Sequence, residues 1–250
     1  MTTPRSQQYI RVKKCPEPDP DIICPVDGWV KPENPWTPPI IPPTPNNEEL
    51  ILLCDRSGDD AIACYTVRGG TGQVRYELYN AETNALLITT DLNSAAKYEM
   101  YFSGYPDVLF FYIRIKPIVS GATITRFYTT TITGFSKDWP IIYADFTKAP
   151  NLTTFAEAFL YISKLKRIDF PNILPECTSM SAALRGTGLL WLFLPQLPKA
   201  TTFANMCNNC QELTQIYLPD DLPECTSMAS MCTDCNKLLE FRFPKTIKKC

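Results

Sequence analysis

The sequence predicts a mixed fold in three successive parts: a proline-rich extended arm, an all-β sandwich and an α/β solenoid of short repeats. Three observations lead to this prediction. Prolines crowd the first part, short alternating segments separated by turn residues fill the second, and the last part repeats one pattern several times. We place the arm at residues 1–47, the sandwich at 48–136 and the solenoid at 137–250.

The arm is too rich in proline to build a packed core, because such a chain favours extended polyproline conformations. It is also too apolar for a freely solvated linker. A flexible spacer is the plainer interpretation, and we favour an arm that anchors the protein by docking along another subunit. The side chains that would be buried there are Ile22, Ile23, Val26, Trp29, Val30, Trp36, Ile40 and Ile41.

The second part has short runs of β-forming residues bounded by turn-forming ones, which is typical of an antiparallel sandwich. The turn Gly69-Gly70-Thr71, followed by Tyr76 and Leu78, resembles the strand turn of bacterial immunoglobulin-like adhesin repeats. The resemblance implies an immunoglobulin-like sandwich. The predicted strands are 49–54, 61–67, 73–79, 85–90, 97–102, 108–115 and 123–133.

The third part contains four repeats with two anchors each, a Thr/Ser pair before an apolar residue and a closing proline. Two anchors that recur together at one period predict a solenoid whose units stack on their neighbours. The apolar anchors are Phe155, Met180, Phe203 and Met228, spaced by 25, 23 and 25 residues, and the closing prolines are Pro171, Pro195, Pro219 and Pro244.

Each unit predicts a helix followed by a short strand. The apolar residues Phe203, Met206, Cys207 and Cys210 have helical spacing, and the Thr/Ser before them can cap the first turn. The run that follows, Leu213-x-x-Ile216-x-Leu218, alternates as in a strand with every second side chain buried. Proline then ends the strand, because it cannot donate to a continuing ladder.

The run from Met206 to Pro219 resembles the units of the BspA-like leucine-rich-repeat family of bacterial surface antigens, roughly A/M-F-x-x-C-x-x-L-x-x-I-x-F/L-P, with Cys207 in place of Phe. The run from Met231 to Pro244 matches equally well, and the unit around Leu184 departs most. The resemblance covers about two-fifths of the chain and implies a leucine-rich-repeat solenoid. It implies function only weakly, because the family is a binding scaffold with many ligands.

Both ends of the solenoid carry partial units. Residues 140–146 form an orphan repeat strand, which we expect to start the solenoid and shield its first unit. Residues 245–250 match the start of another unit, with Cys250 one repeat after Cys225. A solenoid ordinarily ends in a capping repeat, so we expect the natural chain, or its partner, to continue beyond Cys250.

The cysteines of the repeats permit two chemistries besides packing. Cys207-x-x-Cys210 and Cys232-x-x-Cys235 approximate a four-cysteine zinc pattern, and stacked disulfides are a further alternative. The repeat explains the spacing more simply, because each pair recurs after one period of 25 residues. A free cysteine packs as a small hydrophobe. We therefore predict buried core columns, with neither a metal nor a cofactor.

The composition narrows the function. A formal net charge of −2 gives no field that would attract nucleic acid or an anionic membrane. No apolar run is long enough for a spanning helix, and the chain has no histidine, the commonest general base. The first residues lack the apolar core of a secretion signal, so either such a signal has been removed or the protein is used without general export.

The outward-facing positions of the repeat strands are the candidate partner-binding residues. Tyr, Trp and Arg dominate interface hot spots, and an exposed apolar patch usually has a partner. Cover by another subunit or by missing chain, binding of a ligand or receptor, and incidental exposure remain the alternatives. The positions are Arg167, Asp169, Trp191, Phe193, Gln215, Tyr217, Glu240 and Arg242.

Together these observations predict a non-enzymatic structural and adhesive protein of a virion: a bacteriophage head fibre, decoration protein or tail appendage. We expect an oligomer on the particle surface that contacts other virion subunits through its arm and a host-surface protein or glycan through its repeats. The resemblances point to a phage of Bacteroidetes, such as the crAss-like group. A bacterial cell-surface adhesin is the first alternative, and a zinc- or cysteine-dependent enzyme is the second.

Overall fold

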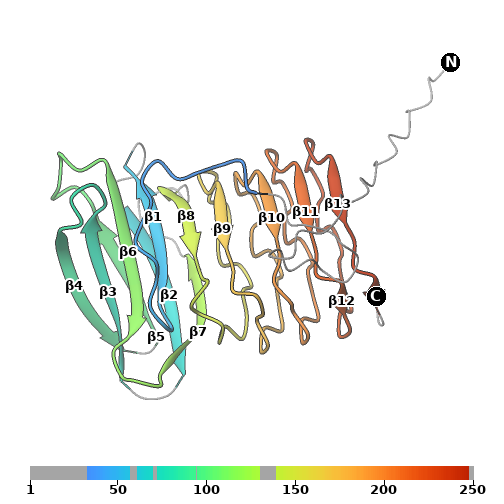
Figure 1. Ribbon diagram of the computed structural model, residues 1–250, viewed down its shortest axis with the longest axis horizontal. Helices are drawn as coiled ribbons and strands as arrows, with labels where there is room; N and C mark the ends of the chain where they lie inside the picture. The colour runs from blue at the N-terminus through green and yellow to red at the C-terminus, as the bar shows by residue number, and fades with distance from the viewer. Residues whose placement is uncertain (1–32, 57–60, 70–71, 94, 130–138, 248–250) are drawn as a thin grey trace, which may run out of the picture.

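The computed structural model describes residues 33–56, 61–69, 72–93, 95–129 and 139–247. Figure 1 shows an elongated molecule with a sandwich of long strands at one end and a stack of short coils at the other. Each coil is one of the sequence repeats, and the coils are numbered in chain order. The strands are β1 (Leu50–Asp55), β2 (Ala61–Gly69), β3 (Gln73–Asn80), β4 (Leu86–Asn93), β5 (Ala95–Tyr101), β6 (Phe110–Pro117), β7 (Thr123–Thr129), β8 (Ile141–Asp145), β9 (Arg167–Asp169), β10 (Trp191–Phe193), β11 (Gln215–Tyr217), β12 (Asp221–Leu222), β13 (Glu240–Arg242) and β14 (Thr246–Ile247).

The sandwich consists of two sheets that share an apolar core. One sheet orders its strands β4-β3-β6-β1-β8-β9, and the other orders them β5-β2-β7. Strands β1–β7 lie where the alternating sequence pattern predicts strands, so that prediction is confirmed. Leu50 and Leu52 of β1 belong to the core between the sheets, whereas Ile51 and Leu53 belong to a second apolar cluster on the opposite face.

The second apolar cluster lies beneath the strap, our name for residues 33–45, which runs along the outer face of the six-stranded sheet (Figure 1). Trp36 of the strap packs against the cluster, and Ile51 and Leu53 are fully buried there. At the end of the strap, the backbone N–H of Asn46 donates to Oε2 of Glu49 at 2.6 Å. The strap therefore contributes to the fold of its own chain.

Strand β8 joins the sandwich to the coils. It pairs antiparallel with β1 and parallel with β9, the strand of the first coil. The prediction that residues 140–146 start the repeats and shield the first unit is confirmed. The six-stranded sheet thus includes described strands from both sides of the predicted domain boundary at residue 137.

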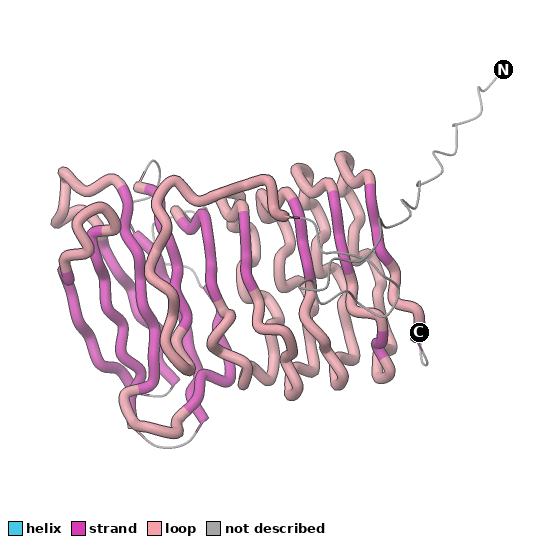
Figure 2. The backbone as a smooth tube through the Cα atoms, viewed as in Figure 1, coloured by secondary structure: helices cyan, strands magenta, loops and turns pink. Residues whose placement is uncertain are grey.

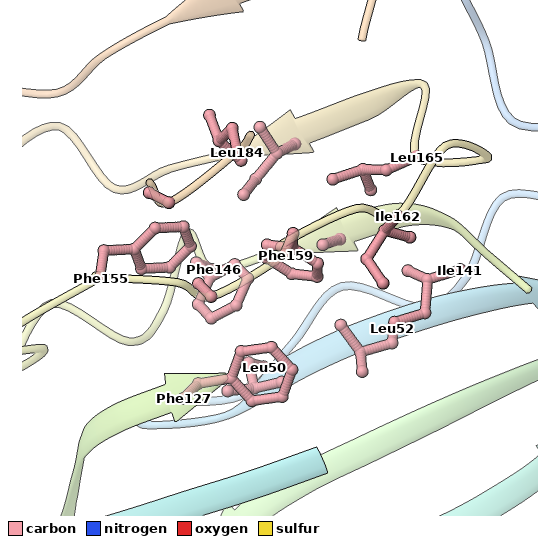
Figure 3. Packing of buried hydrophobic residues seen from close by; sticks show 14 of the residues in the cluster. Leu50, Leu52, Phe127, Ile141, Phe146, Phe155, Phe159, Ile162, Leu165 and Leu184 are labelled. Atoms are coloured by element: carbon pink, nitrogen blue, oxygen red, sulfur yellow. The ribbon is translucent and has the colours of Figure 1, made fainter. Parts of the chain in front are cut away.

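An aromatic seam fills the interior at this junction (Figure 3). The rings of Phe146 and Phe155 lie 5.2 Å apart edge to face, and those of Phe127 and Phe159 lie 5.4 Å apart. All four side chains are fully buried. Because Phe127 comes from β7 and Phe155 from the first coil, the sandwich and the coils share one hydrophobic core.

The predicted fold class is wrong in one respect: the repeats are not an α/β leucine-rich-repeat solenoid. No helix occurs anywhere in the described ranges, and the regular structure there is β-strand (Figure 2). The residues predicted to form a helix in the third repeat are buried as expected, with Phe203, Met206, Cys207 and Cys210 all fully inaccessible. Their backbone is instead a chain of turns.

Two features of this turn segment prevent a helix. Asn205 and Asn209 adopt left-handed backbone conformations, with φ of 56° and 62°. The N–H groups of Phe203 and Cys207 donate to the carbonyls of the next coil, each at 2.8 Å, and so are not used within their own segment. Consecutive turns closed by i to i+3 bonds place apolar residues at nearly helical spacing, which explains the wrong prediction. Equivalent left-handed residues occur in the other coils: Glu157, Tyr161, Ala182, Gly186, Ser230 and Asp234.

The close approach of the coils yields a test of the stacking. A Cβ atom added at Gly188 would collide with the backbone oxygen of Ser163 in the preceding coil. Gly188→Ala should therefore lower the free energy of unfolding by about 1–3 kcal/mol, as overpacked sites do. Gly104→Ala is the matched control, because a Cβ there meets nothing within 4 Å. Denaturant titrations of both variants provide the measurement, and equal midpoints would contradict the stacking geometry.

Candidate partner-binding face

The outer surface of the coil strands carries the predicted partner-binding residues. Strands β10, β11 and β13 form a parallel sheet in which Leu192 pairs with Ile216 and Ile216 with Phe241. Leu192 and Ile216 point into the core, so their neighbours along each strand point outward. The register then aligns two columns of outward side chains: Trp191, Gln215 and Glu240 in one, and Phe193, Tyr217 and Arg242 in the other.

Three aromatic rings form the centre of this face. Phe193 and Tyr217 are stacked, with ring centroids 4.6 Å apart and an interplanar angle of 3°. Trp191 meets Phe193 edge-on at 6.1 Å. Tyr217 is nearly buried, whereas Trp191 and Phe193 remain partly exposed. The stack therefore holds the partly exposed Trp191 and Phe193 rings in a fixed geometry.

The hydroxyl of Tyr217 is held within the same face. It donates to Oε1 of Gln215 at 3.1 Å. Burial raises the pKa of Tyr217, and the neighbouring Glu240 carboxylate raises it further. The hydroxyl is therefore a neutral hydrogen-bond donor across the physiological pH range. The centre of the face is apolar and uncharged.

Paired charges flank the aromatic centre on both sides. Nη2 of Arg167 lies 2.9 Å from Oδ2 of Asp169, and the hydroxyl of Tyr143 donates to the same carboxylate at 2.8 Å. On the other side, Nη2 of Arg242 lies 2.8 Å from Oδ1 of Asp220. Each arginine is fixed by its partner, so both guanidinium groups keep defined positions at the edges of the face.

Sequence reasoning missed a second group of aromatic and charged residues on the outer side of the six-stranded sheet, which is largely buried with the strap and does not extend the exposed face. Tyr79 and Tyr112 stack at 4.7 Å on the outer side of β3 and β6. Arg114 makes two bonds to the fully buried carboxylate of Glu49, at 2.7 and 2.8 Å. The alternation of residues 140–146 was the available signal in the sequence, because it places Tyr143 and Asp145 on the same side of strand β8.

The structure places only part of the predicted anchoring arm. Trp36 is half-buried against the chain's own second apolar cluster, and Ile40 is also half-buried. Ile41 is 84% exposed. Docking of the arm on another subunit stays a prediction. The other predicted arm residues lie outside the described ranges: Ile22, Ile23, Val26, Trp29 and Val30.

The cysteines of the repeats pack as core columns, as predicted. Cys207 and Cys210 are fully buried, and the Cys210 thiol donates to the carbonyl of Leu184 at 3.0 Å. Cys232 and Cys235 are half-buried because they belong to the last coil. Within the described ranges, no group of three or more His, Cys, Asp or Glu side chains has an arrangement that could hold a metal ion.

Hydrogen bonding between the two buried thiols separates their acidities. The pKa of Cys207 is raised by its bond to Cys210 and by burial, whereas the same bond lowers the pKa of Cys210 to about 7. A low pKa favours the thiolate, which is the nucleophilic form. Reaction also needs access, and both sulfurs lie beneath the next coil. Their position favours a structural role.

Comparison with known proteins identifies no relative. None of the protein-family models, curated proteins or solved structures compared with the chain matches it. In the part of the chain that the structure describes, no helix long and apolar enough to cross a membrane is found. The functional argument therefore depends on the geometry of the face.

Selective alkylation tests the cysteine columns. In native protein at mildly alkaline pH, iodoacetamide should modify Cys235 before Cys232: both are partly exposed, but the bond between the two sulfurs lowers the pKa of Cys235 and raises that of Cys232. Cys177, Cys207 and Cys210 should react only after denaturation, because they are buried; burial also raises the pKa of Cys177 to about 11. Peptide mass spectrometry provides the measurement. Faster labelling of Cys207 than of Cys232 would place the inner sulfurs in an open cleft and refute this packing.

Proposed function

We propose that this protein is a non-enzymatic structural and adhesive subunit that binds a partner macromolecule through the outer face of its coil strands. The stacked aromatic centre carries this proposal. Trp191, Phe193 and Tyr217 lie on neighbouring strands at fixed spacing, with Arg167 and Arg242 at the edges. Interfaces concentrate their binding energy in such aromatic and arginine side chains.

The rigidity of the face supports a binding role. The side chains sit on hydrogen-bonded strands, and ion pairs already hold both arginines. A partner would therefore find the contact residues pre-arranged and would lose little conformational entropy on binding. A host-surface protein or a glycan would suit the exposed rings, since both offer apolar surfaces with hydrogen-bonding groups at their edges.

The setting that we propose is the surface of a virion, as a head fibre, decoration protein or tail appendage of a bacteriophage. The order of the chain supports it: an arm that anchors, a sandwich that acts as a spacer, and coils that display the binding face. The sequence resemblances to BspA-like surface antigens and to bacterial immunoglobulin-like adhesins favour a Bacteroidetes host. Many copies on one particle would multiply weak contacts. A bacterial cell-surface adhesin is the rival assignment, and immunogold labelling of purified particles separates the two.

A cysteine-dependent enzyme has less support. Such an enzyme needs a thiolate that substrate can reach, and the thiols of Cys207 and Cys210 are enclosed between coils. The sequence also has no histidine to act as a partner base. Binding remains the function that the geometry supports best.

Removal of the exposed tryptophan tests the face. Trp191→Ala should weaken adhesion of fluorescently labelled protein to Bacteroidetes host cells by about tenfold or more, because hot-spot truncations cost about 2 kcal/mol or more. Tyr217→Phe, which keeps the stacked ring, should have a smaller effect. Cell-binding isotherms by flow cytometry provide the measurement, with thermal unfolding as a check on the fold.

Tyr101→Ala is the matched control, because Tyr101 is an exposed aromatic residue on β5, away from the coil strands. It should leave adhesion unchanged. Equal loss of adhesion in the Trp191 and Tyr101 variants, or no loss in either, would contradict the assignment of this face.

A further inference from the structure

The stack of coils has one closed end and one open end. At the first coil, the N–H of Thr129 in β7 donates to the carbonyl of Ala158 at 2.9 Å, and the N–H of Thr153 donates to that of Thr125 at 2.8 Å. The sandwich thus covers the first coil. The last coil has no such cover among the described residues. We call the last coil, residues 226–247, the end coil.

The apolar columns of the stack are exposed at the end coil. Phe203 and Leu213 are fully buried in the preceding coil, whereas their counterparts Met228 and Leu238 are half-exposed. The contrast is larger at the residue directly before the closing proline of each repeat, where Leu218 is 3% exposed and Phe243 is 63% exposed. Exposed apolar side chains in a continuous column indicate an interface that a further coil would bury.

A row of backbone donors accompanies these side chains. Between coils, alternate N–H groups donate to the next coil: Phe203 to Ser227 and Cys207 to Met231, each at 2.8 Å. The same pattern joins the earlier coils, for example from Phe155 to Ser179 at 2.9 Å. In the end coil the corresponding donors meet no backbone acceptor in the described part of the chain. They are the N–H groups of Met228, Ser230, Cys232 and Asp234.

The direction of these bonds determines what can bind. Along this row each coil gives donors to the following coil and receives donors from the preceding one, so at the open end this row presents donors, whereas the row of Thr178, Thr201 and Thr226 runs the other way and presents the carbonyl of Thr226. A two-fold contact that brought this row against the same row of a second copy would oppose donor to donor. An extended segment that offers carbonyl oxygens and apolar side chains would satisfy this row, as in the addition of a strand to a sheet edge.

The sequence of the arm has this chemistry. Residues 15–30 include four prolines, which keep a carbonyl acceptor but lack an N–H. Residues 15–32 contain four carboxylates and one lysine, whereas the end coil and the three residues after it (226–250) contain five basic and two acidic side chains, of which Lys237, Arg242 and Lys245 already pair with Glu212 or Asp220. Charge, acceptors and apolar content therefore all complement the end coil. The apolar members are Ile22, Ile23, Val26, Trp29 and Val30.

We propose that residues 15–32 of one copy dock on the end coil of a second copy and complete its stack. This inference rests on the proposed function, since it identifies the partner of the anchoring arm. Each copy has one arm and one end coil, so the arm of one copy contacts the end coil of the next. This is a head-to-tail contact. Such contacts generate rings or open filaments, depending on whether the rotation closes.

Peptide binding tests the docking surface directly. A chain lacking residues 1–32 retains the strap that packs on its own sheet, and so keeps its fold. A synthetic peptide of residues 15–32 should bind this truncated chain, and high salt should weaken the complex because the two charges are opposite. A peptide in which the four carboxylates are replaced by amides should bind less tightly. Fluorescence anisotropy gives the affinities, and an absence of binding would overturn the proposal.

A matched pair of variants locates the site. Phe243→Asp, which puts a charge into the exposed apolar column, should lower the affinity for the peptide by about tenfold or more. Ile173→Asp is the control, since Ile173 is a similarly exposed apolar residue, 44% accessible, on an inner coil. Equal effects of the two substitutions would overturn the assignment. Trp191→Ala should leave peptide affinity unchanged, so failure of this docking is distinguishable from failure of the adhesive face.

Sedimentation distinguishes a second copy from the same chain as the source of the arm. The full chain should self-associate as its concentration rises, and the chain lacking residues 1–32 should remain monomeric. Amide exchange at Met228 and Cys232 should slow as the full chain associates. A full chain that stays monomeric while these amides are protected would place the arm on its own end coil and would overturn the intermolecular proposal.

Discussion

The backbone hydrogen bond from one coil to the next is the constraint on which the rest of this structure depends. The bond from Phe203 to the carbonyl of Ser227, at 2.8 Å, recurs between all successive coils at equivalent residues. It replaces the intrahelical bond and fixes the register of the strands on the other side of each coil. Because that register is fixed, Phe193 lies directly over Tyr217. The partner-binding face is thus a consequence of how the coils stack.

The sandwich makes this stacking possible, because a repeat unit has no core of its own. Strand β8 gives the first coil a strand to pair with, and Phe127 and Phe146 give it an apolar surface to cover. The result is one continuous core, so the binding face is fixed relative to the sandwich. A face held in this way would bind a partner without first being ordered, which favours affinity.

Much of the architecture could be predicted from the sequence, and the failures have physical reasons. Period-two alternation was sufficient for β1–β7 and for the outward residues of the coil strands. The helix prediction failed because a chain of turns buries the same residues as a helix would. Asn205 and Asn209 carried a usable signal, since Asn tolerates left-handed backbone, but Tyr161 carried none. The pair of Glu49 and Arg114, 65 residues apart, required the pairing of β1 with β6 and had no local signal.

The polarity of the stack also explains why one chain would need two different contact surfaces. Along the row that includes Phe203, every coil donates in the same direction, so this row of the end coil cannot pair with the same row of a second copy. A contact with this row must come from a segment that offers hydrogen-bond acceptors. Such a contact leaves the partner-binding face with Trp191 free. The two surfaces differ in kind as well: the end coil offers backbone donors that meet no backbone acceptor among the described residues, and the partner-binding face offers side chains whose charges are already paired. Backbone pairing suits permanent assembly, whereas a pre-arranged aromatic face suits a contact that forms later, and the same stack supports both.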